Sequence, residues 1–263
     1  MLAVMLAGSV MAATASAEAG PFWHHRSNTK ELVGGKIEPT APENFKGTGG
    51  EQKLKGTIGT TAVEITSSSL QVKGAIFNGP DRGQVKIELV YNQPRLVKPN
   101  FPNCIVTVGT KNIVVVKGHL MWKWNGTSTQ LNQVVQQPEQ TPDIVFTAVE
   151  PMQQKPFVEK INMTNNGTFT TVALKGGECG VLTGMFNVSG SEVGLPNPSH
   201  TEEWSKKLAV RTVEAQPTFL QHYWDQEAYQ GALVGLTFAN NPASLIGQTE
   251  VEAEQQEVAV FEK

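Results

Sequence analysis

Short runs of alternating apolar and polar residues recur from about residue 63 to the end of the chain. Alternation with a period of two is typical of strands that turn one face toward a core. Turn signals separate the runs, and Asn165–Gly167 favours a hairpin because Asn-Gly accepts positive φ. We therefore predict an all-β fold, an antiparallel β-sandwich or a curled β-barrel of about a dozen short strands. The expected strands span 63–66, 70–77, 84–91, 105–108, 113–124, 144–149, 157–163, 169–174, 181–188, 208–213, 233–238, 245–251 and 258–261.

One segment is also compatible with a short helix. Ser199 and Glu202 have the spacing of a capping box, and Trp204 and Leu208 lie four residues apart. Apolar and long side chains nevertheless alternate from Trp204 to Val210, and the following residues are β-branched. We favour a strand here.

Several of the expected strands contain a glycine two residues after an apolar position. They are Gly74, Gly118, Gly184 and Gly247. Glycine inside a strand marks a bulge, a bend or a close approach of another segment. Because the intervals between these glycines are unequal, they favour a sheet that curls over a repeating solenoid.

The N-terminal residues have the pattern of an export signal. Leu2 to Ala15 is an apolar run, and Ala15-Ser16-Ala17 provides the small side chains that signal peptidase requires. We predict a signal peptide at 1–17 with cleavage after Ala17, and the alternative is a buried helix. No later run reaches the ~18 apolar residues that a membrane-spanning helix requires.

Residues 18–44 show no periodicity and contain three prolines. We expect this segment to form an extended N-terminal arm, followed by a single β domain at 45–263. Charged residues make up 17% of the chain, and the net charge is −3. Without a strongly basic surface, binding to nucleic acid or to an anionic membrane is not expected.

The chain contains two cysteines, Cys104 and Cys179. In an exported protein, paired thiols are oxidised, so we predict a disulfide between them. On the chain-entropy model, closing a loop of this length stabilises the fold by about 4 kcal/mol. The alternative is a reactive nucleophile at Cys179, which would need a base, and no histidine is near it in sequence.

Aromatic residues supply the candidate ligand-binding positions. Trp122 and Trp124 alternate on one face of an expected strand, and Tyr223 and Trp224 form a second aromatic pair. Such side chains can stack on sugar rings or fill a core, and the sequence leaves both roles open.

Catalytic patterns are sparse. Glu252, Glu254 and Glu257 resemble the spaced acids of jelly-roll glycoside hydrolases, but we favour a solvated face of a terminal strand as the explanation. None of the common catalytic or nucleotide-binding motifs occurs, and adjacent His24 and His25 point apart in an extended segment. We expect no catalytic residues, no metal and no cofactor.

Four segments carry a resemblance to a known family: Pro102–Val106 (PNCIV), Lys117–Leu120 (KGHL), Gly177–Gly184 (GECGVLTG) and Gly235–Gly247 (GLTFANNPASLIG). On these segments, the chain resembles a family of secreted, uncharacterised proteins of soil actinobacteria over roughly two thirds of its length. The family has no known activity, so the resemblance implies secretion and fold without a reaction.

The sequence leaves three functions open. The first is a secreted non-enzymatic β domain with a binding or structural role outside the cell or at the cell envelope, whose ligand is unknown. The second is a β-barrel that binds an apolar ligand, in which Trp122 and Trp124 would face a cavity. The third is a glycan-binding or glycan-hydrolysing jelly roll.

Overall fold

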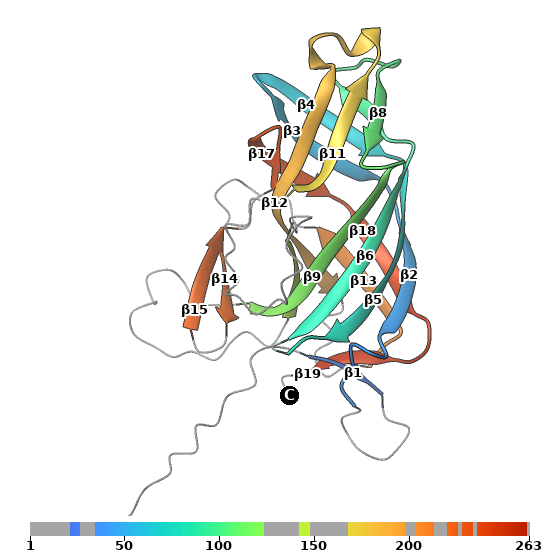
Figure 1. The fold of residues 1–263 in the computed structure, drawn as a ribbon, viewed down its shortest axis with the longest axis vertical. Helices are drawn as coiled ribbons and strands as arrows, with labels where there is room; N and C mark the ends of the chain where they lie inside the picture. The colour runs from blue at the N-terminus through green and yellow to red at the C-terminus, as the bar shows by residue number, and fades with distance from the viewer. Residues whose placement is uncertain are drawn as a thin grey trace, which may run out of the picture.

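The protein is an elongated, almost entirely β-stranded barrel (Figure 1). Neighbouring strands pair in antiparallel fashion throughout the described chain, and a single 3₁₀ segment interrupts them. The computed structural model describes residues 22–26, 35–80, 82–123, 142–147, 168–197, 204–212, 220–225, 228–233 and 236–261. At positions 119, 121–123, 142–147, 191–197, 211, 220–225, 228–233 and 261 it describes the backbone.

Eight of the described strands form a closed circuit that we call the lower ring, after its place in Figure 1. Each strand hydrogen-bonds to the next around the circuit, and the last returns to the first. In order around the ring they are β2 (Glu43–Gly49), β5 (Ser69–Asn78), β6 (Gly83–Asn92), β9 (Ile113–Lys123), β10 (Pro142–Thr147), β12 (Gly184–Asn197), β13 (Lys207–Thr212) and β18 (Gln248–Ala253).

A second circuit of described strands, the upper ring, lies above the first (Figure 1). The rings share β12, whose first half pairs in the upper ring and whose second half pairs in the lower ring. The other strands of the upper ring, in order, are β3 (Gln52–Ile58), β4 (Thr61–Ser67), β7 (Arg95–Lys98), β8 (Ile105–Val108), β11 (Thr168–Lys175), β16 (Leu236–Phe238) and β17 (Asn241–Ile246).

Two glycines mark places where the chain passes between the rings. Gly190 lies where β12 changes partners, and its φ of 101° is accessible to glycine at little cost. Gly247 separates β17 of the upper ring from β18 of the lower ring, and a Cβ there would collide with the buried amide of Gln52. Gly247 was expected to mark a bulge, a bend or a close backbone approach; the chain passes from one ring to the other here, and the close contact is with a side chain.

The two ends of the barrel are closed by different elements. At the lower end, β1 (Phe22–His25) pairs with β19 (Val258–Phe261) to form a small separate sheet. At the upper end, the 3₁₀ segment η2 (Gly177–Leu182) crosses over the strands (Figure 1). A hairpin of β14 (Leu220–Asp225) and β15 (Ala228–Leu233) continues outward from the end of β9.

The interior contains two clusters of buried apolar residues. The upper cluster includes Val172, Leu174 and Phe238, and it surrounds the disulfide. The lower cluster includes Trp23, Ile37 and Phe45. Ile87, Leu89 and Tyr91 of β6 are only partly buried and pack against both clusters, so the interior is continuous from one ring to the other.

The predicted all-β class and the disulfide are confirmed. Residues 207–212 form a strand, as we favoured over a helix. One expected strand begins too early, because Val181 lies in η2 and β12 starts at Gly184. The expected signal peptide and the expected strand at 157–163 lie outside the described residues.

The segment expected to be an extended arm contains structure that the sequence did not indicate. Phe22 and Trp23 in β1 are buried, Ile37 is buried, and β2 already begins at Glu43. A four-residue strand is too short to produce a detectable period, which explains why the pattern missed it.

Candidate functional site: an apolar cavity in the barrel

A cavity of about 200 Å³ lies inside the barrel, between the two clusters of buried residues. Its lining is almost entirely apolar and comes from both rings. The upper ring contributes Leu54 and Phe169, and the lower ring contributes Val72, Leu208 and Val251, among others.

Strand alternation explains why the wall is apolar. Leu208, Val210 and Thr212 occupy every second position of β13, and all three line the cavity. Leu208 is paired with Val251 in the neighbouring strand β18, and both line the cavity. Residues directly opposite in an antiparallel pair project from the same face of the sheet. The pairing therefore builds a continuous apolar wall across the two strands.

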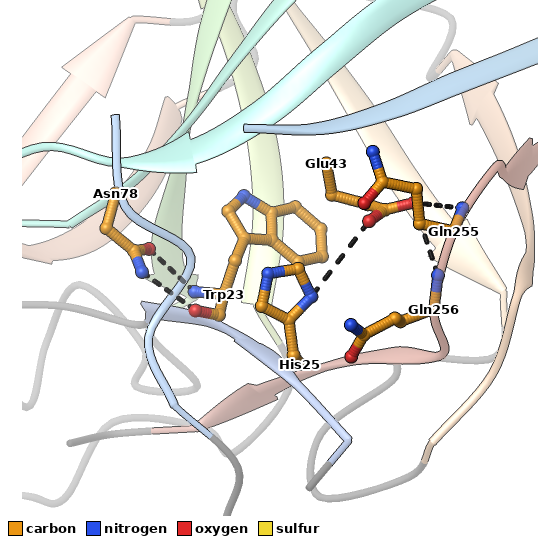
Figure 2. A network of polar contacts seen from close by, with 6 residues as sticks. All are labelled: Trp23, His25, Glu43, Asn78, Gln255 and Gln256. Atoms are coloured by element: carbon orange, nitrogen blue, oxygen red, sulfur yellow. Dashed lines mark hydrogen bonds and ion pairs between the residues drawn. The ribbon is translucent and has the colours of Figure 1, made fainter. Parts of the chain in front are cut away.

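The floor of the cavity is built from the small sheet at the lower end. Trp23 of β1 and Val258 of β19 both line the cavity and are both buried. Asn78, at the end of β5, holds Trp23 in place through two hydrogen bonds, as Figure 2 shows. The backbone amide of Trp23 donates to Oδ1 of Asn78 at 2.8 Å, and Nδ2 of Asn78 donates to the carbonyl of Trp23 at 2.7 Å. The side chain of Asn78 thus acts as a strand partner for β1.

The buried carboxylate of Glu43 holds the other side of the floor in place through hydrogen bonds. Glu43 is 0% exposed, and its Oε1 accepts hydrogen bonds from the backbone amides of Gln255 (2.7 Å) and Gln256 (3.4 Å). These two residues form the turn that connects β18 to β19. Oε2 of Glu43 lies 4.0 Å from Nδ1 of His25 in β1 (Figure 2). The carboxylate therefore ties the turn before β19 to the start of the lower ring.

Some polar atoms of the floor remain without a hydrogen bond among the described residues. They are Nε1 of Trp23, Nδ1 of His25 and Oε2 of Glu43, and all three are buried. A buried polar atom without a partner costs free energy on the order of 1–3 kcal/mol. The hydrogen-bonding groups of the floor are therefore less completely paired than those of an ordinary protein interior.

The disulfide lies at the opposite end of the barrel. Cys104 and Cys179 are joined with a Cα–Cα distance of 4.8 Å, and both residues are buried. The bond connects the start of β8 to η2, and neither cysteine lines the cavity. Cys179 is therefore a structural residue, and the alternative of a free nucleophile was wrong.

The structure brings two of the four candidate aromatic positions together along the backbone. Trp122 of β9 is paired with Trp224 of β14, and Tyr223 is paired with Lys123. Only the backbone of these residues is described, and Trp124 lies outside the described residues. Their proposed contact with a ligand stays a prediction.

The acids near the C-terminus do not converge on the cavity. Glu252 and Glu254 are exposed, and neither belongs to the lining. Glu254 lies beyond the end of β18, where it forms an ion pair with Lys46 at 3.6 Å, and Glu257 pairs with Arg26. Across the described part of the chain, no cluster of three or more His, Cys, Asp or Glu side chains could hold a metal ion.

Sequence reasoning missed the residues that form the floor. The run Phe22-Trp23-His24-His25 lies in the segment 18–44, which we expected to be an extended arm. Its two adjacent large aromatic residues, both of which become buried, were the available signal.

No helix in the described ranges is long and apolar enough to cross a lipid bilayer. No protein-family model, curated protein or solved structure matches the chain. The geometry of the barrel is therefore the basis for assigning a function.

Proposed function

We propose that the protein is an exported binding protein that holds a small apolar molecule inside its barrel. The observation that carries this proposal is the apolar cavity of about 200 Å³. An engineered cavity of about 150 Å³ with a similar apolar lining binds benzene. The cavity is therefore large enough for a ligand of that size or for part of a longer one.

The energetic cost of such a cavity supports a role for it. Packed interiors contain few voids larger than a water molecule, and space left unfilled in a core lowers stability. A cavity of about 200 Å³ is therefore unusual in a barrel of this size. Larger side chains at Val210 or Val251 would fill the space, and a ligand would supply the same contacts.

Export is the second part of the proposal. The apolar run before Ala15-Ser16-Ala17 supports a signal peptide, and the Cys104–Cys179 disulfide is compatible with an oxidising compartment. We expect N-terminal sequencing of the protein from the culture medium to begin at Glu18. Retention of the full chain inside the cell would contradict export.

A paired cavity variant and surface variant test the binding function. Val251→Trp places an indole in the cavity, whereas Glu252→Trp places one on the exposed face of the same strand. We expect 1-octanol, an uncharged eight-carbon probe, to bind the wild type and Glu252→Trp equally in calorimetric titrations. Val251→Trp should bind at least about tenfold more weakly, since the indole occupies the space of the probe.

The cavity proposal fails if the wild type does not bind the alcohol, or if both tryptophan variants bind it as the wild type does. Thermal melts establish that each variant is folded. If Val251→Trp does not fold, Leu208→Phe blocks the same wall from the neighbouring strand, and Lys207→Phe is its surface control.

A carbohydrate ligand is the second candidate, because the backbone pairing sets Trp122 opposite Trp224. Two indoles at adjacent positions can form a stacking platform for a sugar ring. Trp224→Ala should then abolish retention on polysaccharide columns while leaving octanol binding unchanged. Retention of the variant would remove this candidate.

A further inference from the structure

Lys206 is the only charged residue in the described lining of the cavity. The other polar residues of the lining are neutral, such as Gln52, Tyr91 and Thr249. A charged residue in an otherwise apolar wall is uncommon, because a charge without a partner is strongly disfavoured away from water.

The strand register accounts for its position. Lys206 lies one residue before β13 and two residues before Leu208, so it continues the alternate positions that face the cavity. Its carbonyl accepts a hydrogen bond at 2.8 Å from the amide of Ala253, which also lines the cavity. Lys207, the next residue, is exposed and does not line the cavity.

Among the described lining residues, Lys206 is also the only one that is exposed. A residue that is both exposed and part of the wall lies where the cavity reaches the surface. The adjacent Ser205 pairs with Val258 of the floor through two backbone hydrogen bonds, so this mouth lies beside β19. Within the described ranges, no carboxylate forms an ion pair with the ammonium group of Lys206.

We propose that the ligand is an amphipathic anion, an alkyl chain with one terminal carboxylate, whose charged end pairs with Lys206 at the mouth. The chain lies in the apolar cavity, and the carboxylate stays near water beside the ammonium group. A lysine suits this place because its methylene stem covers apolar surface while its charge remains hydrated. This inference rests on the proposed binding function and names the class of ligand for it.

Octanoate and 1-octanol test the inference, since they share a chain length and differ in charge. At pH 7.5 octanoate is ionised, and we expect the wild type to bind it about fivefold more tightly than the alcohol. Lys206→Gln should remove this preference, because it should weaken octanoate binding more than octanol binding. Lys207→Gln is the matched control and should retain the preference.

The outcomes separate the two proposals. If the wild type binds both probes equally and Lys206→Gln has no effect, Lys206 does not select the ligand, although the binding function stands. If neither probe binds, the binding function itself fails. Raising the salt concentration should weaken octanoate binding in the wild type and in Lys207→Gln but not in Lys206→Gln, because screening acts on the exposed ion pair. A preference that survives both high salt and Lys206→Gln would overturn the assignment.

Discussion

The upper end of the barrel, around Cys179, and the lower end, around Trp23, are closed by different means. A covalent bond closes the upper end, and the residues around it are tightly buried, including Leu174 and Phe238 at 0% exposure. A short sheet closes the lower end through hydrogen bonds and side-chain packing. Next to it, wall residues such as Leu208 and Val210 are only partly buried, because they border the cavity.

The comparison separates stability from binding. Both rings line the cavity, but neither cysteine of the upper end does. The lower end contains the floor of the cavity, its mouth and buried polar atoms that make no hydrogen bond among the described residues. Functional regions commonly occupy the less stable part of a fold, so we expect the lower end to be the less stable of the two. Four predictions test the contrast, in order of decreasing effect.

Deletion of residues 18–26 should have the largest effect. It removes β1, including Phe22 and Trp23, and the loss of two buried aromatic side chains should cost more than about 5 kcal/mol. We expect the shortened protein to lose its cooperative unfolding transition in urea. Deletion of residues 18–20 alone is the control and should leave the transition unchanged. A stable truncated domain would show that the lower end does not need its floor.

Replacement of both cysteines by alanine should lower the free energy of unfolding by about 4 kcal/mol, given the 75-residue separation. Octanol binding by the folded variant should remain unchanged, because neither cysteine lines the cavity. Chemical denaturation and calorimetry measure the two quantities separately. Weaker binding in the folded variant would mean that the two ends are coupled.

Replacing a leucine with alanine should lower the free energy of unfolding by different amounts in the two rings. Leu174→Ala removes a completely buried side chain from the upper ring and should cost about 3–4 kcal/mol. Leu208→Ala removes a partly buried side chain that already borders empty space and should cost about 1–2 kcal/mol. Equal shifts in the urea midpoint would contradict the difference in packing.

Neutralising the two acids of the lower end should have the smallest effects. Glu43→Gln replaces the carboxylate that accepts hydrogen bonds from the turn before β19 with a neutral amide. This change should lower the free energy of unfolding by about 2 kcal/mol. Glu254→Gln removes an exposed ion pair with Lys46 and should cost under about 1 kcal/mol. Thermal melts of the two variants provide the comparison, and a larger loss for Glu254→Gln would refute it.

Local patterns in the sequence predicted the strands that are long and half-buried. The residues of β5 and β6 alternate clearly, and Cys104 and Cys179 were the only possible disulfide pair. The patterns could not predict β1, because its four residues are held by Asn78 and β19, which are distant in sequence. The role of Lys206 also depended on knowing which face of β13 borders the cavity.

The pairing of β1 with β19 also constrains the order of assembly. Phe22 is aligned with Phe261, so the floor joins two segments that are far apart in the sequence. Contacts between such distant segments require closure of a long loop and form slowly. During synthesis or translocation, β1 must wait for its partner until β19 has emerged. The lower end of the barrel therefore stays open until these two strands meet, and the nascent interior is accessible during that interval.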